Sequence, residues 1–286
     1  MRPAVEPVDA VGAGVDPARP PTVPIRPLAF RELLDEPFAL IQAHIRPLAI
    51  LGGSALAVAV LVVLGFTGLV SHLTDGSDAG TWWAAILSTA GCVWLVRLVL
   101  RGTTVALTMA DFRGTRFGLR AAMRTAAQHS GPLVVAQLMF SLLGIGILVV
   151  GSLLIITYPL ALIWLSYVRA GRFGTEPAIV GEHAGFGVAV ARSKQLTQHA
   201  EWRIAGLWLL QRLLFAVLAV PAFGIPFFLS DFSGTHRWAF IALLVSGWLL
   251  VVVIAEIVEA TSRVVCYIDR RCVREGLDIT IPGEQR

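Results

Sequence analysis

The sequence has little charge. Only 15% of its 286 residues are Asp, Glu, Lys or Arg, and 56% are hydrophobic, whereas a soluble domain carries about 25% charged residues. The mean hydropathy of +0.74 indicates that most of the folded surface faces lipid. Because a helix needs about 20 apolar residues to cross roughly 30 Å of hydrocarbon, this composition predicts an all-α polytopic bundle with little room for a soluble domain.

Cysteine and catalytic motifs are also scarce. Cys92, Cys266 and Cys272 are too few and too poorly spaced for a disulfide framework or a zinc site, so we expect free thiols. The six histidines lack the paired spacing of a zinc protease, and the chain has neither a Gly-x-Ser-x-Gly elbow nor a Gly-rich phosphate loop. We therefore expect no catalytic site, no metal site, no cofactor and no enzymatic activity.

The excess of positive charge is small and lies beside apolar segments. The net charge is +4 and the isoelectric point is about 9.4, but the arginines do not form the aromatic-laced soluble patch that binds nucleic acid. Arginines at the ends of apolar segments are typical of contacts with anionic phospholipids. The expected partner is the lipid bilayer, and no nucleic-acid partner is expected.

Apolar runs with interfacial flanks predict six membrane spans. The region of residues 132–168 is long enough for two short spans that turn near Gly144, Gly146 and Gly151, and too long for one ordinary tilted helix. We predict a hairpin there, with a single helix as the alternative. The six candidate spans are residues 47–70, 82–109, 132–150, 152–168, 204–229 and 238–268.

Lysine and arginine collect in alternate connecting segments. They are frequent in residues 113–124, 169–203 and 263–274, whereas residues 71–80 contain none and residues 230–237 contain one arginine. Basic segments near span ends stay on the cytoplasmic side. We therefore predict a multi-pass protein of the plasma (inner) membrane with both termini in the cytoplasm.

This topology divides the chain into three parts. Residues 1–27 contain seven prolines and no apolar core after a basic start, which is typical of a disordered cytoplasmic tail rather than a cleaved signal peptide. Residues 28–272 form the predicted six-span domain, and residues 273–286 form a cytoplasmic C-terminal tail.

A weak threefold pattern precedes the spans. Three stretches can be aligned on an initial phenylalanine and a later Gln/His pair, and each stands just before two candidate spans. The pattern predicts three repeats, each an amphipathic interfacial helix followed by a transmembrane hairpin. The stretches are FRELLDEPFALIQAHIRPLAI from Phe30, FGLRAAMRTAAQHSGPLVVA from Phe117 and FGVAVARSKQLTQHAEWRIAG from Phe186.

The second stretch carries a basic helical face. Arg113, Arg116, Arg120 and Arg124 are spaced by three and four residues, which places four positive charges on one side of a helix. A helix of this kind lies in the membrane plane with its arginines near anionic headgroups. Two roles stay open: a connector that covers the cytoplasmic end of the bundle, or a part in sensing or shaping lipid.

Ionisable residues also occur inside the candidate spans. Arg97, Arg101, Arg212, Glu256 and Glu259 form a predicted intramembrane polar cluster, roughly 10 to 15 Å from the cytoplasmic interface by helical rise. A lone charge at that depth is costly. We therefore predict that one of the two glutamates pairs with Arg212 or Arg101, either as a functional polar path or as an ion pair that fixes helix register.

Three segments resemble an actinobacterial family of uncharacterised polytopic proteins known as glycerophosphoryl diester phosphodiesterase membrane-domain proteins. They are PLAFRELLDEPFALIQAHIRPL near the N-terminus, YIDRRCVREGLD from Tyr267, and a central stretch after Ala178. A departure is Gly181-Glu182-His183, where that family reads Glu-Gly. The resemblance implies a membrane domain without the soluble hydrolase barrel. The residues that carry it in the central stretch are Glu182, Ala191, Arg192, Ser193, Leu196 and Trp202.

Two functions follow as hypotheses. The first is a non-enzymatic scaffold or accessory subunit of a membrane complex, with lipid contacts at the cytoplasmic leaflet and a membrane-protein partner. The alternative is a transporter or lipid-handling protein in which Arg101, Arg212 and Glu256 line a polar cavity.

Overall fold

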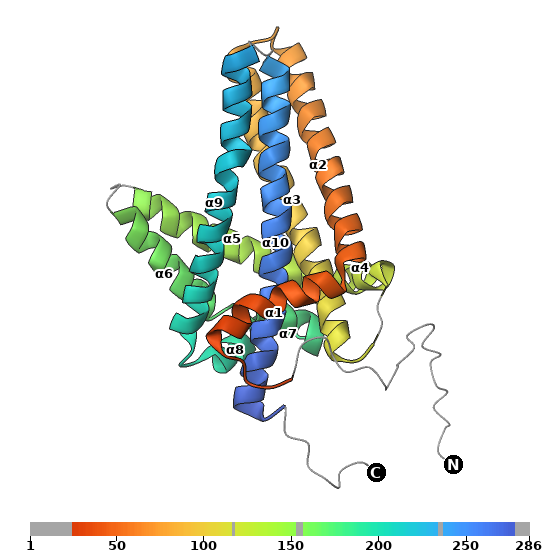
Figure 1. The fold of residues 1–286 in the computed structure, drawn as a ribbon, viewed down its shortest axis with the longest axis vertical. Helices are drawn as coiled ribbons and strands as arrows, with labels where there is room; N and C mark the ends of the chain where they lie inside the picture. Colours follow the sequence, from red (N-terminus) through yellow and green to blue (C-terminus); the bar gives the residue numbers. More distant parts are fainter. Residues whose placement is uncertain (1–24, 116–117, 153–156, 234–236, 278–286) are drawn as a thin grey trace.

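A computed structural model of the chain describes residues 25–115, 118–152, 157–233 and 237–277 (Figure 1). These ranges are helical and contain no β-strand, so the predicted all-α class is confirmed. Most of the predicted N-terminal tail and residues 278–286 lie outside the described ranges. The helices are α1 (Phe30–Ala43), α2 (Ile45–Leu73), α3 (Asp78–Phe112), α4 (Leu119–Gln128), α5 (Ser130–Ser152), α6 (Tyr158–Ala170), α7 (Thr175–Glu182), α8 (Phe186–Thr197), α9 (Glu201–Ser233) and α10 (Arg237–Glu275).

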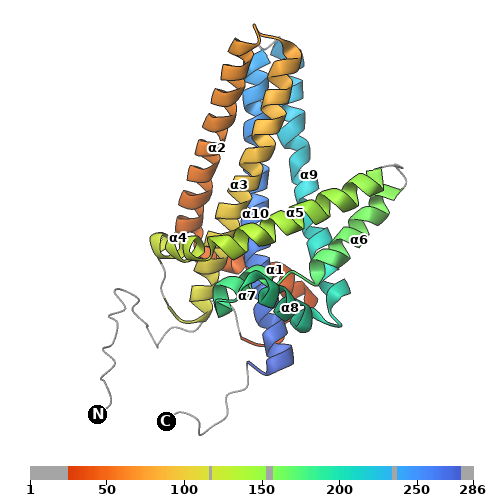
Figure 2. The same ribbon diagram turned by 180° about the vertical axis from the view of Figure 1, so that it is seen from behind.

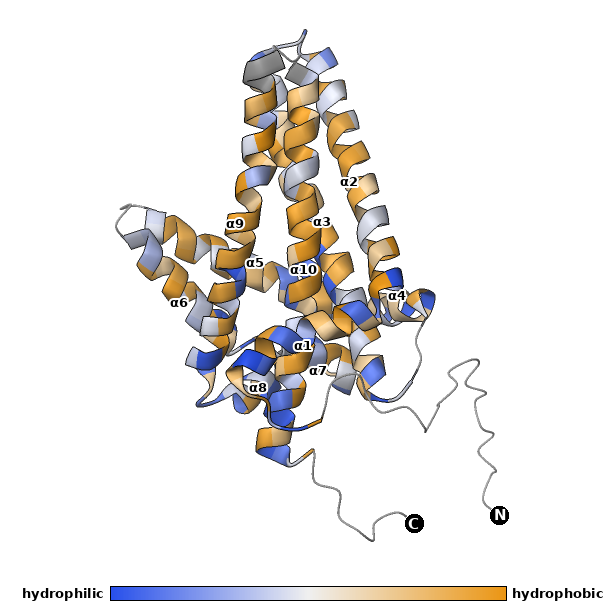
Figure 3. Cartoon of the chain, viewed as in Figure 1, coloured by the Kyte–Doolittle hydropathy of each residue, from blue (hydrophilic) through white to orange (hydrophobic). Residues whose placement is uncertain are grey.

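Five of these helices, α2, α3, α5, α9 and α10, are long and apolar enough to cross a membrane. Four of them, α2, α3, α9 and α10, lie side by side as long rods in Figures 1 and 2. Hydrophobic residues cover most of their length, and hydrophilic residues gather toward the end that holds α1, α4, α7 and α8 (Figure 3). We call this the basic end. The five helices are compatible with a multi-pass integral membrane protein.

The second predicted hairpin differs from the other two. Its helices, α5 and α6, are steeply inclined to the long rods, and their tip lies well short of the turn between α2 and α3 (Figures 1 and 2). The predicted span at residues 152–168 corresponds to α6, which has 13 residues. Such a helix is about 20 Å long, less than the roughly 30 Å of a hydrocarbon core. The six-span count is therefore not confirmed.

The threefold order is visible only in outline. Each of α1, α4 and α8 precedes a pair of longer helices, and the chain breaks at His44, His129 and Gln198 before those pairs begin. However, α7 has no counterpart elsewhere among the described residues, and the α5–α6 pair is shorter and differently inclined. The equivalence of the three units stays a prediction.

The amphipathic faces divide between the bundle and the outside. On α1, Leu33 and Leu40 are buried, whereas Phe30 and Phe38 are exposed next to charged neighbours. The single apolar face expected from the spacing is therefore split, because the helix crosses the bundle and only one flank of that face meets it. On α4 only Ala122 is buried, and most of the helix remains available to a lipid surface.

The core is built around α10, which packs on α2, α3, α9, α1, α7 and α8. Small residues allow the close approach of helices, as is common in membrane bundles. A Cβ at Gly52 would lie 3.0 Å from Cγ1 of Val253, and a Cβ at Gly102 would lie 3.1 Å from Cδ1 of Leu133. This central position carries the polar residues of α10 into the middle of the molecule.

Candidate functional site

Two adjacent helices supply the centre of a polar cluster. Arg97 and Arg101 stand one turn apart on α3, and Glu256 faces them from α10. The Nε of Arg97 donates to Oε2 of Glu256 over 2.9 Å, and the Nε of Arg101 donates to Oε1 over 2.5 Å. Glu256 is 1% exposed, so its charge is compensated by two guanidinium groups rather than by solvent.

Glu259 stands one helical turn further along α10 and forms the second centre. Its carboxylate accepts a 2.7 Å hydrogen bond from Nη2 of Arg263 and pairs with Arg212 of α9. Arg101 and Arg169 approach the same carboxylate at 3.6 and 3.9 Å. The structure therefore brings all five residues of the predicted intramembrane cluster together. One glutamate was expected to pair with Arg101 or Arg212, and both do so: Glu256 with Arg101 and Glu259 with Arg212.

The structure adds four residues that the sequence reasoning missed. Glu176 of α7 is 2% exposed and accepts hydrogen bonds from Nη1 of Arg101 at 3.3 Å and from Nη1 of Arg263 at 2.6 Å. Gln137 of α5 accepts from Nη1 of Arg101 at 3.2 Å. Arg169 and Arg263 come from segments that we had counted as cytoplasmic, and the fold buries them in the cluster.

Helix α7 lies inside the bundle and is buried along almost its whole length. This position places Glu176 in the cluster. Residues 175–180 are all buried, which is unusual for a segment between two basic stretches. A Cβ at Gly181 would lie 2.7 Å from Cε of Met109, and one at Gly174 would lie 3.0 Å from Cδ2 of Tyr267. The apolar run Pro-Ala-Ile-Val after Glu176 was the available signal that this segment enters the bundle.

Residues of the central resemblance stretch hold α7 in place. Glu182 accepts a hydrogen bond from the hydroxyl of Tyr267 and lies 3.1 Å from Nε of Arg192, which also pairs with Glu275 at 2.5 Å. Burial lowers the pKa of Arg192, but the hydrogen bond and charge of Glu182, with Glu275, outweigh burial and raise it. The Oγ of Ser193 accepts from the Gly174 amide at 3.1 Å. These contacts are structural, and they position Glu176.

The predicted headgroup contacts lie apart from the cluster. Arg120 and Arg124 are exposed on α4. The predicted single basic face is wrong for Arg113, because this residue directly follows α3, before the chain turns into α4, and it donates to the Gly181 carbonyl oxygen of α7. Arg116 lies outside the described residues. The fold therefore separates a surface group of arginines from the buried cluster.

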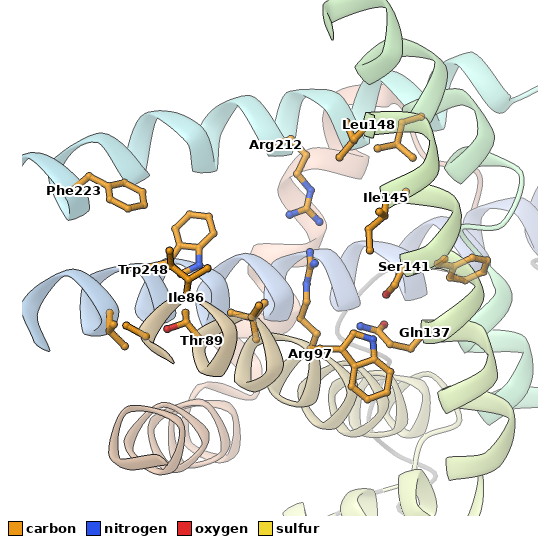
Figure 4. A pocket seen from close by; sticks show the side chains of 18 of the residues that line it. Ile86, Thr89, Arg97, Gln137, Ser141, Ile145, Leu148, Arg212, Phe223 and Trp248 are labelled. Carbon is orange, nitrogen blue, oxygen red and sulfur yellow. The ribbon is translucent and has the colours of Figure 1, made fainter. Parts of the chain in front are cut away.

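A cavity of about 700 Å³ adjoins the cluster. It is bounded by α3, α5, α6, α9 and α10, and most of its wall is apolar or aromatic. Figure 4 shows Arg97 and Arg212 reaching toward each other from α3 and α9, with Gln137 and Ser141 on α5 nearby. Apolar and aromatic side chains form most of the rest of the lining, among them Trp248, Phe223, Ile86, Ile145 and Leu148.

Three arginines face this cavity, and the others stand behind them. Arg97, Arg169 and Arg212 line the cavity and their side chains are 28%, 17% and 28% exposed. Arg101 and Arg263 are almost fully buried and are absent from the lining. The cavity therefore has apolar walls and one cationic end.

Trp208 lies close to two of these cations. The guanidinium carbons of Arg169 and Arg212 lie 5.3 and 5.1 Å from the centroid of its ring, within cation–π distance. Trp208 is 5% exposed, and its Nε1 has no hydrogen-bond acceptor among the described residues. The Nε of Arg169 likewise has no acceptor there. Buried donors without acceptors are rare in folded proteins.

The arginines give the cavity hydrogen-bond donors and positive charge at one end. Guanidinium groups stay protonated in proteins and present several donors in a plane. The three glutamates are each held by at least two arginines. Among the described residues, no three His, Cys, Asp or Glu side chains are grouped so that they could hold a metal ion.

Comparison with known proteins adds no relative. No family model, curated protein or solved structure matches this chain. The resemblance to the actinobacterial membrane-domain family therefore stays a prediction, and the function has to be argued from the site itself.

Proposed function

We propose that this protein handles lipid by binding an anionic headgroup at the cationic end of the cavity and an acyl chain along its apolar wall. The observation that carries the proposal is the placement of Arg97, Arg169 and Arg212 at one end of a wall that is otherwise mainly apolar and aromatic. Binding rather than catalysis is the proposed activity.

The energetics favour an anion from outside the chain. A charge buried at membrane depth costs several kcal/mol unless it is paired. Glu256 and Glu259 compensate part of the positive charge of the arginines. A phosphate or carboxylate group would compensate more of it, and arginine binds such groups with two parallel hydrogen bonds.

The dimensions suit a lipid. Along α3 the cavity lining extends from Trp82 to Arg97, which corresponds to about 22 Å of helix and exceeds the roughly 15 Å half-thickness of a hydrocarbon core. A volume of about 700 Å³ lies within the roughly 300 to 1,000 Å³ of ligand pockets. An extended acyl chain therefore fits the wall better than a compact polar solute does.

The same proposal sets the orientation. We place the basic end, with α1, α4, α7 and α8, at the cytoplasmic face of the plasma membrane, because arginines near span ends stay on that side. Arg120 and Arg124 would then contact anionic phospholipids of the inner leaflet. The cationic end of the cavity would lie toward that leaflet.

A scaffold or accessory subunit is the second candidate. The observation in its favour is the pair of phenylalanines, Phe30 and Phe38, that α1 exposes at the basic end. A membrane-protein partner that covers them would co-purify in a fixed ratio. If only lipid covers them, the purified protein would contain no second polypeptide.

Native mass spectrometry of the protein purified in mild detergent tests the lipid proposal. We expect one retained anionic lipid on the wild type, and a loss of at least about tenfold in Arg97→Gln and Arg212→Gln, because each change removes a charge-assisted hydrogen-bond donor. Arg31→Gln is the matched control, since it removes an exposed arginine of α1 that is not part of the cavity lining. Equal retention in all four proteins, or no retained lipid, would contradict the proposal.

A further inference from the structure

The cluster carries more positive than negative charge. The side chains linked by its ion pairs are five arginines, at positions 97, 101, 169, 212 and 263, and three glutamates, at positions 176, 256 and 259. Among the described residues this leaves an excess of two positive charges. Arginine does not lose its proton in proteins, so the excess persists at any physiological pH.

Three of the five arginines of the cluster, Arg97, Arg169 and Arg212, line the cavity. Arg101 and Arg263 contact Glu176 directly and are sealed from the cavity. The lining arginines Arg169 and Arg212 both lie within cation–π distance of Trp208. Two of the buried donors without an acceptor, Nε of Arg169 and Nε1 of Trp208, belong to residues that line the cavity. Charge and unused donors therefore coincide at one end of the cavity.

From this coincidence, and resting on the lipid-binding function proposed above, we infer that the ligand group is a phosphomonoester. Such a group carries about −1.5 to −2 charges at pH 7 and has three terminal oxygens that accept hydrogen bonds. It would neutralise the excess of two and offer an oxygen to each of Arg97, Arg169 and Arg212. A carboxylate or a phosphodiester carries one charge and would leave one positive charge buried without compensation.

The space behind the arginines supports the same choice. Because Arg101 and Arg263 are packed against α7 and lie outside the cavity lining, an alcohol attached to the phosphate would find no space beyond the guanidinium groups. A terminal phosphate at the end of a lipid meets this constraint, whereas a phosphate with a further headgroup alcohol does not.

A competition experiment with the full-length protein in detergent tests the inference. The probes are phosphatidic acid, phosphatidylglycerol and phosphatidylcholine with identical acyl chains, and inorganic phosphate as a soluble competitor. Retention is read by native mass spectrometry at pH 5 and pH 7.5. We expect phosphatidic acid to be retained about tenfold more than phosphatidylglycerol at pH 7.5 and phosphatidylcholine least of all.

The comparison of pH 5 with pH 7.5 tests the contribution of the second negative charge of the phosphomonoester. A phosphomonoester loses its second proton with a pKa of about 6, so its dianionic fraction rises about tenfold between pH 5 and pH 7.5. Retention of phosphatidic acid should rise over that interval, whereas retention of phosphatidylglycerol should not. Arginine charge is constant throughout, so the rise would come from the ligand.

Two conservative variants separate donor geometry from folding. Trp208→Phe keeps an aromatic ring but removes the N–H donor together with part of the ring volume, and Arg169→Lys keeps the charge and removes the free Nε. Both should reduce the preference for phosphatidic acid over phosphatidylglycerol at least about threefold, while the thermal stability of Arg169→Lys stays near that of the wild type. Arg31→Gln should change neither quantity, because the Arg31 side chain is 92% exposed on α1 and lies outside the cavity lining.

The outcomes distinguish the two proposals. Equal retention of phosphatidic acid and phosphatidylglycerol, reduced together by Arg97→Gln, would overturn the phosphomonoester inference and leave anionic lipid binding intact. Retention of every lipid without any effect of Arg97→Gln would overturn the proposed function itself. Full displacement of phosphatidic acid by equimolar inorganic phosphate would assign the phosphate group to a soluble ligand and overturn its assignment to a lipid.

Discussion

Arg101 and Glu256 are 155 residues apart in the chain and are joined by a 2.5 Å hydrogen bond between Nε and Oε1. Both side chains are nearly inaccessible to solvent. Their contact joins α3 to α10, and through Glu176 it also fixes α7. Removing one member of a buried pair leaves an uncompensated charge, so this contact should be among the most sensitive in the protein.

Glu256→Gln should destabilise the protein by about 3 to 5 kcal/mol, because it leaves Arg97 and Arg101 without their shared carboxylate. The free energy of unfolding in detergent measures this. Glu275→Gln is the matched control: Glu275 pairs with Arg192 and Arg271 at the more accessible basic end, and its loss should cost less than about 1 kcal/mol. Equal effects of the two changes would show that the buried pair is unimportant.

Gly151→Val should separate α5 from α6, because a Cβ at this position would overlap the Cβ of Ala161. We expect a loss of about 1 to 3 kcal/mol in stability and a clear fall in lipid retention, since Gln137 and Arg169 reach the cavity from these two helices. Gly146→Val is the control, because a Cβ there meets nothing within 4 Å. Similar losses in both variants would mean that the helix tolerates neither, and that the contact with Ala161 is not the cause.

Single-cysteine labelling tests the orientation. All three native cysteines are buried, so they should react slowly and can be replaced by alanine for this experiment. A membrane-impermeant maleimide applied to intact cells should label Asp75→Cys, in the turn between α2 and α3, and should label Arg120→Cys only after permeabilisation. The reverse pattern would invert the topology.

A separate labelling site, Tyr158→Cys, tests whether the α5–α6 pair crosses the membrane. This residue is exposed at the start of α6, near the tip of the inclined hairpin. Because α6 is about 20 Å long and the tip lies short of the α2–α3 turn, we expect no labelling from outside the cell. Labelling as fast as that of Asp75→Cys would instead restore the six-span topology predicted from hydropathy.

The stability of the start of α1 should depend on pH. Hydrogen bonds from Arg26, and from the Ala29 amide, lower the pKa of Glu32 below its model-peptide value of 4.5. A lowered pKa in the folded state means that this stabilisation is present above about pH 4.5 and is lost as the pH falls through the folded-state value. Hydrogen exchange of the Ala29 amide should accelerate in acid relative to neighbouring amides, and Glu32→Gln should abolish that difference. If the exchange rate of the Ala29 amide followed that of the neighbouring amides at every pH, the contact would not form.

Much of the cluster was predictable because the cost of a buried charge is a local property. Arg97, Arg101, Arg212, Glu256 and Glu259 each stand within an apolar run long enough to be a span. Any such residue needs a partner of opposite charge inside the bundle. The pairs that formed, Arg101 with Glu256 and Arg212 with Glu259, follow from that requirement and from similar depth.

The rest depended on contacts between distant segments. Glu176, Arg169 and Arg263 stand in basic stretches whose composition indicates a cytoplasmic location. The insertion of α7 among α3, α5, α8 and α10 buries Glu176 and brings it to Arg263, whereas Arg169 joins the cluster from α6. No periodicity within residues 175–182 encodes that insertion, because the helix is buried around its whole circumference.

The sequence by itself determined that this chain is helical and apolar enough to cross a membrane several times, because lipid demands internally bonded backbone and apolar side chains. It also determined that the charges within its spans must find partners. Only the tertiary structure decided which partners they found, how α5 and α6 are inclined, and that three arginines line a largely apolar cavity. Those outcomes depend on side chains meeting across helices, where packing and charge compensation are settled together.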